Sequence, residues 1–159
     1  GRTPTELAFA SGKHLASYRE DHFLQMLLPD IQDLEDVFLA ALTVGKEDLP
    51  LSAQAKERAL PIAKAIGPLL EPAQKDRLRE LFRRFVEEGG RTNLNRWAHA
   101  ADLTALRAGL LLSDDLAAAQ AMLELDGGDD IEQKMNDLII FYTSDRCSRL
   151  RQSLGVALT

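Results

Sequence analysis

The sequence contains one cysteine, Cys147, and three histidines among 159 residues. A lone cysteine cannot form a disulfide within the chain, and no pair of Cys or His residues has the spacing of a zinc site. The fold must therefore rest on a core of ordinary apolar side chains, and a reducing compartment, the cytoplasm, is expected. We predict no metal and no cofactor.

Long hydrophobic runs are also missing. No apolar stretch reaches the roughly 18 residues that a membrane-spanning helix needs, and the first residues of the sequence do not have the charged, apolar and small-residue pattern of a secretory leader, which a mature fragment would have lost. The formal net charge of -6 disfavours nucleic acid or an anionic membrane as the main partner. We therefore expect neither nucleic-acid binding nor membrane binding.

No segment alternates apolar and polar residues between hairpin turns, which argues against a β-sheet. A repeat period of about 33 to 47 residues, typical of helical arrays, is absent as well. The pattern predicts an all-α fold, a single irregular domain over residues 1–159 with eight or nine helices. Thr3-Pro4-Thr5-Glu6 is a capping box with proline at the first helical position. Because a helix starts so abruptly, we expect a domain cut from a larger protein.

One helix is expected to organise the others. Asn93 is a good N-cap, no proline interrupts the residues after it, and the predicted helix runs from about Leu94 to Leu112. Its apolar residues lie on more than one side, which indicates a buried, central helix. Four polar or charged residues interrupt this pattern and must be paired or functional: Arg96, His99, Asp102 and Arg107. For His99 and Asp102, one turn apart, a structural hydrogen bond is favoured over a catalytic dyad.

A proline lies inside the predicted fourth helix, which begins after Ser52 and ends before Gly67. Pro61 lacks a backbone N–H and its ring crowds the preceding turn. We therefore expect Pro61 to kink this helix or to break it in two.

The loop Asp126-Gly127-Gly128-Asp129-Asp130 is rich in carboxylates and suggests calcium at first sight. It lacks the spaced ligands of an EF-hand and the bidentate glutamate that ends one. A solvated turn before the next helix is the preferred interpretation.

The central helix resembles part of a known family. Arg96-Trp97-Ala98-His99-Ala100-Ala101-Asp102-Leu103-Thr104-Ala105-Leu106-Arg107-Ala108-Gly109-Leu110 is similar to the third-ligand helix of small bacterial zinc metallopeptidases of the HtpX type, of the kind attached to tetratricopeptide-repeat proteins. In that family a glutamate on this helix binds zinc and an aspartate one turn later supports the site. Asp102 and Leu106 occupy those two positions here.

The same family carries an upstream His-Glu-x-x-His helix, in which both histidines bind zinc and the glutamate activates water. The best match is Thr5-Glu6-Leu7-Ala8-Phe9, with Glu6 at the position of the general base. Thr5 and Phe9 replace the histidines, and neither a hydroxyl nor a phenyl ring substitutes for imidazole at zinc. The resemblance thus implies a pseudo-peptidase with degenerate ligand positions Thr5, Phe9 and Asp102. The alternative is chance, with Glu6 a capping-box residue and Asp102 a paired core acid.

Two functions are left open by these residues. The preferred one is a non-catalytic protein-binding or scaffolding domain of a bacterial protein, whose partner is another protein or a neighbouring domain. A purely structural spacer is a further hypothesis. The alternative is a hydrolase-like enzyme that uses Glu6 and Asp102, with His99, as acid and base on a small substrate. A water-filled pocket lined by these groups would favour the enzyme. Phe9 and Leu106 filling that space would favour the binding domain.

Overall fold

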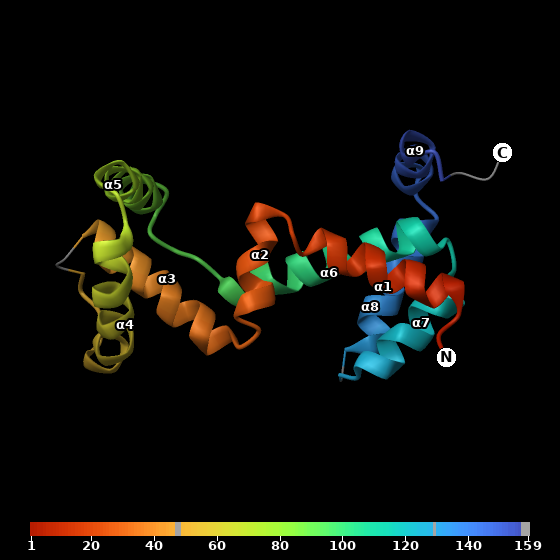
Figure 1. The fold of residues 1–159 in the computed structure, drawn as a ribbon, viewed down its shortest axis with the longest axis horizontal. Coiled ribbons are helices and arrows are strands. Elements are labelled where there is room, and N and C mark those ends of the chain that lie inside the picture. The colour runs from red at the N-terminus through yellow and green to blue at the C-terminus, as the bar shows by residue number, and fades with distance from the viewer. Residues whose placement is uncertain (47–48, 129, 157–159) are drawn as a thin grey trace. The chain divides into compact units, whose positions relative to one another are not determined.

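The computed structural model describes residues 1–46, 49–128 and 130–156. Within these ranges the chain forms nine α-helices and one short 3-10 helix, with no strand (Figure 1). The predicted all-α class and the predicted number of helices are therefore confirmed. No helix in the described ranges is both long enough and apolar enough to cross a membrane.

The chain divides into two compact units. Unit 1 contains Gly1–Met26 and the described part of Trp97–Thr159, and unit 2 contains Leu27–Arg96. A single cooperative domain over residues 1–159 stays a prediction, and a measurement that tests it is given below.

Unit 1 is built from α1 (Pro4–Ala16), most of α2 (Glu20–Leu27), most of α6 (Leu94–Ser113), α7 (Leu116–Asp126), α8 (Ile131–Tyr142) and α9 (Asp145–Leu154). Helix α7 packs against α1 and α8, and α8 packs against α9. Side chains from these helices and from α6 form one buried cluster, which we call the core cluster: Phe9, Leu106, Leu110, Ala119, Met122, Leu123, Leu138, Phe141 and Cys147.

Unit 2 contains α3 (Ile31–Gly45), α4 (Ala53–Ile66), the 3-10 helix η1 (Gly67–Leu69) and α5 (Pro72–Glu87). Helix α3 packs against both α4 and α5. The buried cluster of this unit consists of three alanines, Ala40, Ala59 and Ala63. Small side chains let two helices approach closely but bury little apolar surface.

Pro61 does not divide α4, which runs without interruption from Ala53 to Ile66. The predicted break is wrong. Proline removes one intrahelical hydrogen bond, to the carbonyl four residues earlier. Both Pro61 and Glu57, the residue that carries that carbonyl, are exposed. The orphaned carbonyl oxygen therefore has access to water.

Helix α6 begins at Leu94 as predicted and ends at Ser113, one residue beyond the expected end. The side-chain oxygen of Asn93 accepts the backbone N–H of Arg96 at 2.9 Å, which is the predicted cap. Burial follows one face only, through Ala101, Ala105, Leu106, Gly109, Leu110 and Ser113. The helix is thus the centre of unit 1 over its second half, with a solvent-facing side along its length.

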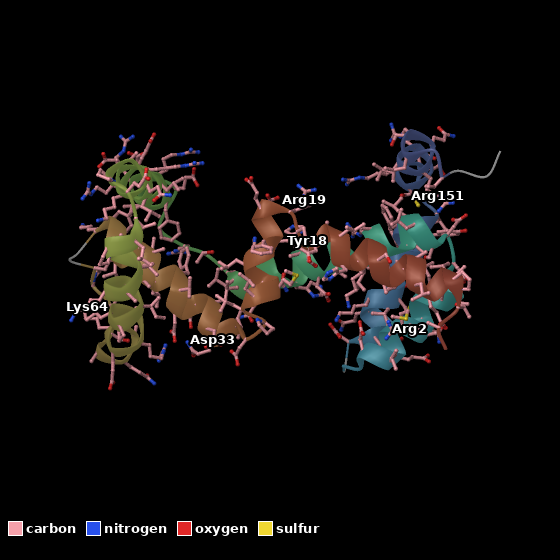
Figure 2. All side chains as sticks on the ribbon, viewed as in Figure 1. Arg2, Tyr18, Arg19, Asp33, Lys64 and Arg151 are labelled. Carbon is pink, nitrogen blue, oxygen red and sulfur yellow. The ribbon has the colours of Figure 1, made fainter. Side chains whose placement is uncertain are left out.

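Helix α9 is anchored by a buried arginine. Arg151, labelled in Figure 2, donates to the carbonyl of Leu111 at 2.7 Å and to that of Val156 at 2.6 Å. It also pairs with the carboxylate of Asp114 at 2.8 Å. These bonds tie the end of α6 to the end of α9, so the surface between these two helices has a defined shape.

Candidate functional site

The first two residues of the peptidase-like motif belong to the cap of α1. The backbone N–H of Thr3 donates to the Glu6 carboxylate at 2.8 Å, and the backbone N–H of Glu6 donates to the Thr3 hydroxyl at 3.2 Å. The Thr5 hydroxyl hydrogen-bonds that of Thr3. Glu6 therefore performs the reciprocal bonding of a capping box.

Phe9, at the second histidine position, lies fully buried in the core cluster. Its ring covers Gly109 of α6, where a Cβ would stand 3.0 and 3.1 Å from ring carbons Cδ2 and Cε2. Leu106 is fully buried in the same cluster. Phe9 and Leu106 are therefore packed apolar side chains of one cluster.

Asp102, at the position of the third ligand, is held by a lysine from α8. The Lys134 ammonium lies 2.9 Å from the Asp102 carboxylate and 3.2 Å from that of Asp130. Partial burial lowers the pKa of Lys134, but the hydrogen bonds and charges of the two aspartates outweigh it, so the pKa is raised. Asp102 is therefore a paired acid.

The predicted hydrogen bond between His99 and Asp102 does not form. His99 is exposed, and the residues described contain no hydrogen bond between the two side chains. A spacing of three positions brings side chains near each other on a helix, but the cation on α8 supplies the stronger partner for the carboxylate. Glu6, His99 and Asp102 are thus each placed in different surroundings.

Asp102 instead faces a small polar cavity of about 160 Å³, which Lys13, Ser17, His22 and Gln25 also line. The Nδ1 atom of His22 is buried there and has no hydrogen-bond partner among the described residues. His22 was not among the site residues that the sequence predicted. No local sequence pattern predicts this cavity, because its lining brings together residues of α1, α2 and α6.

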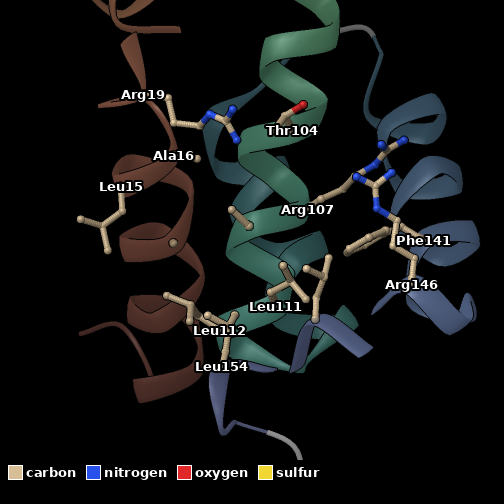
Figure 3. Close-up of a pocket in the computed structure, with 13 residues that line it drawn as sticks. Leu15, Ala16, Arg19, Thr104, Arg107, Leu111, Leu112, Phe141, Arg146 and Leu154 are labelled. Carbon is tan, nitrogen blue, oxygen red and sulfur yellow. The ribbon is translucent and has the colours of Figure 1, made fainter. Parts of the chain in front are cut away.

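The larger feature of unit 1 is an open cleft of about 470 Å³. Its lining comes from α1, α6, α8 and α9, together with Arg19 just after α1 (Figure 3). Figure 3 shows Arg19, Arg107 and Arg146 toward one end of the cleft and Leu111, Leu112 and Leu154 toward the other. The cleft is therefore amphipathic along its length.

Arg107 is fixed in this cleft. Its Nε donates to Oδ2 of Asp137 at 2.8 Å, its Nη2 bonds the other carboxylate oxygen, and its guanidinium lies 5.6 Å from the centre of the Phe141 ring. A bidentate pair and a ring contact together hold a guanidinium in one orientation. In the part of the chain that the structure describes, Asp137 is the one hydrogen-bond acceptor recorded for the Arg107 guanidinium.

The carboxylates of the Asp126–Asp130 loop also have partners. Asp126 pairs with Lys13 at 2.6 Å and Asp130 pairs with Lys134, whereas Asp129 lies outside the described residues. Elsewhere in the described ranges, no three His, Cys, Asp or Glu side chains gather as ligands for a metal. At about 470 Å³ the cleft is larger than the 160 Å³ cavity beside Asp102.

Comparisons with protein-family models, curated proteins and solved structures found no match to this chain. The site must therefore be interpreted from its own chemistry. Phe9 and Leu106 are packed in the core cluster, and the amphipathic cleft begins one turn farther along α1 at Gly12.

Proposed function

We propose that this chain is a non-catalytic protein-binding module, derived from a zinc-peptidase-like helical fold that lost its metal ligands. The observation that carries this proposal is the burial of Phe9 against Gly109 and Leu106. A general base needs water or substrate within hydrogen-bonding reach. The packed phenyl ring leaves no such space at the former ligand position.

The contacts of Glu6 and Asp102 argue against the alternative function, an enzyme that uses these two carboxylates as acid and base. Glu6 accepts the N–H of Thr3 in the cap, and Asp102 is neutralised by Lys134. Neither is positioned with the other as an acid and base pair. We further place this module in a bacterial cytoplasm, where the single buried Cys147 stays reduced.

Calorimetric titration of zinc into the chelator-treated chain at neutral pH tests the loss of the metal site. We expect no stoichiometric heat. Zinc binding tighter than about 1 μM, equivalent to roughly 8 kcal/mol, would contradict the proposal if the Asp102→Ala variant abolished it. Binding that survives in Asp102→Ala would come from other surface groups and would leave the assignment of the lost site intact.

A further inference from the structure

The charge of the cleft opposes the charge of the chain. The whole sequence has a formal net charge of -6, yet the described lining includes Arg19, Arg107 and Arg146 and no acidic residue. Arg107 is paired with Asp137 from outside the lining, and Arg19 forms an exposed pair with Asp21 at 3.2 Å. Arg146 has no ion pair with any residue that the structure describes. One end of the cleft therefore presents three guanidinium groups, of which Arg146 carries a charge that no described carboxylate balances.

Three leucines of the lining, each on a different helix, are exposed; Leu112 and Leu154 lie toward the other end, and Leu15 lies on the α1 side (Figure 3). Leu15 on α1 is 63% exposed, Leu112 on α6 is 38% exposed and Leu154 on α9 is 55% exposed. Singly exposed leucines are ordinary. Three of them lining one cleft, together with Leu111 and Leu150, expose apolar surface whose burial would be favourable.

We propose that this cleft binds an amphipathic acidic helix of another protein. Its apolar side chains would cover the exposed leucines of the lining, and its carboxylates would lie against Arg19, Arg107 and Arg146. This inference rests on the proposed protein-binding function and names the chemistry of the partner. Complementary charge is the basis of the assignment, because carboxylates bind guanidinium groups through short, paired hydrogen bonds.

The exposure of the leucines that line the cleft favours a polypeptide over a small amphiphile as the occupant. Ligand cavities bury most of the surface of a small molecule, whereas Leu15 and Leu154 keep more than half of their surface in water. The cleft follows α6, with α1 on one side and the C-terminal helices on the other (Figure 3). A helix in such a groove presents apolar residues at spacings of three and four, with charged residues beside them.

Arg107 and Arg146 would contribute to binding in different ways. Arg107 is already held in one orientation by Asp137 and the Phe141 ring. Its hydrogen-bond donors would therefore lose little conformational entropy when a ligand binds. Arg146 is exposed and free of ion pairs in the described structure, so its charge is fully available to an incoming carboxylate. Arg146 is therefore the residue whose reversal tests the proposal best.

The experiment is a selection of binders from a displayed library of helical peptides with randomised surface positions, using the full chain as bait. We expect selected peptides to be enriched in Leu or Phe at spacings of three and four, and in Asp and Glu beside them. Fluorescence anisotropy then measures affinity for a selected peptide and for its Glu→Lys counterpart. The counterpart should bind at least about tenfold more weakly, because like charges would meet at the arginines.

Two pairs of variants locate the peptide. Arg146→Glu should weaken binding about tenfold, and Arg149→Glu, on the same helix outside the lining, should not. Leu15→Ser should weaken binding, whereas Leu125→Ser, equally exposed at 63% but outside the cleft, should leave it unchanged. Thermal unfolding by circular dichroism confirms that each variant is folded.

Selection without acidic enrichment, equal binding of both peptides, or insensitivity to Arg146→Glu and Leu15→Ser would overturn the proposal. So would a library that yields no binder, or displacement of every selected peptide by dodecanoate with tighter affinity, which would identify a small amphiphile as the occupant. These outcomes are separate from the zinc titration. If peptides bind regardless of their charge and the zinc titration shows no binding, the acidic partner is ruled out while the proposed protein-binding function stands.

Discussion

Gly12 on α1 lies against Gly109 on α6 so closely that a Cβ on Gly12 would stand 2.9 Å from the Cα of Gly109. The same Cβ would be 2.5 Å from the carbonyl oxygen of Ala108. These neighbours are backbone atoms, which cannot rotate away as a side chain can. Because Phe9 covers Gly109 one turn earlier on α1, the glycine crossing also sets the position of the buried ring and of the cleft beside it.

The first prediction concerns this crossing. Gly12→Ala should lower the free energy of unfolding by about 1 to 3 kcal/mol, because the added methyl group forces the helices apart. Alanine favours a helix over glycine by about 1 kcal/mol, which offsets only part of that cost. Urea unfolding followed by circular dichroism measures the difference.

Ser11→Ala is the matched control, since Ser11 is exposed on the same helix. It should change the free energy of unfolding by less than about 0.5 kcal/mol. Equal stability of the two variants would mean that the helices separate at no cost, contrary to the close approach described here.

The second prediction concerns Phe9 itself. Phe9→Ala should cost about 3 to 5 kcal/mol, because it removes a fully buried ring and leaves a cavity against Gly109. Leu7→Ala, at a side chain 52% exposed on the same helix, should cost less than about 1 kcal/mol. Thermal unfolding compares the two. A Phe9→Ala variant as stable as Leu7→Ala would show that the ring is not part of the core.

Local features of the fold followed from the sequence better than the site did. The cap at Thr3 and Glu6 and the start of α6 after Asn93 were predictable because side chains within three positions make those bonds. The partner of Asp102 was not, because Lys134 lies on another helix and nothing in the local pattern selects it among the lysines. The cavity beside His22 and the cleft that Arg19, Arg107 and Arg146 share likewise join residues of different helices, which no local pattern predicts.

The third prediction concerns the pH dependence of Tyr142. The negative charge of Asp114 raises the pKa of the Tyr142 phenol, with partial burial adding to it and the charge of Arg151 opposing it. Folding therefore favours the neutral phenol. This contribution to stability is complete below the ordinary pKa of tyrosine, near 10, and is lost as the pH rises through the raised value.

Asp114→Asn should move the titration of Tyr142 to lower pH, as read from the absorbance of the phenolate. Asp114 has a φ of 53°, and asparagine tolerates this left-handed conformation, so the backbone is retained. Tyr142→Phe identifies which of the two tyrosine titrations belongs to Tyr142. An unchanged or higher midpoint in Asp114→Asn would contradict the assigned cause.

The fourth prediction distinguishes the two units by stability. The largest fully buried side chains, Phe9, Leu106, Leu110 and Leu138, all belong to unit 1, whereas the buried cluster of unit 2 is made of alanines. Because stabilisation by burial scales with apolar area, α4 and α5 should open at a lower free energy than α6 and α8. Native-state hydrogen exchange with mass spectrometry should show faster exchange over residues 53–66 and 72–87 than over 101–113 and 131–142.

Gly12→Ala sharpens this measurement, because it alters unit 1 alone. It should speed exchange over residues 101–113 and leave residues 53–66 unchanged if the two units open independently. Equal opening free energies across all helices, lowered together by Gly12→Ala, would contradict independent opening. That result would instead establish the single cooperative domain that the length and pattern of the sequence predict, with the small alanine cluster stabilised only as part of the whole.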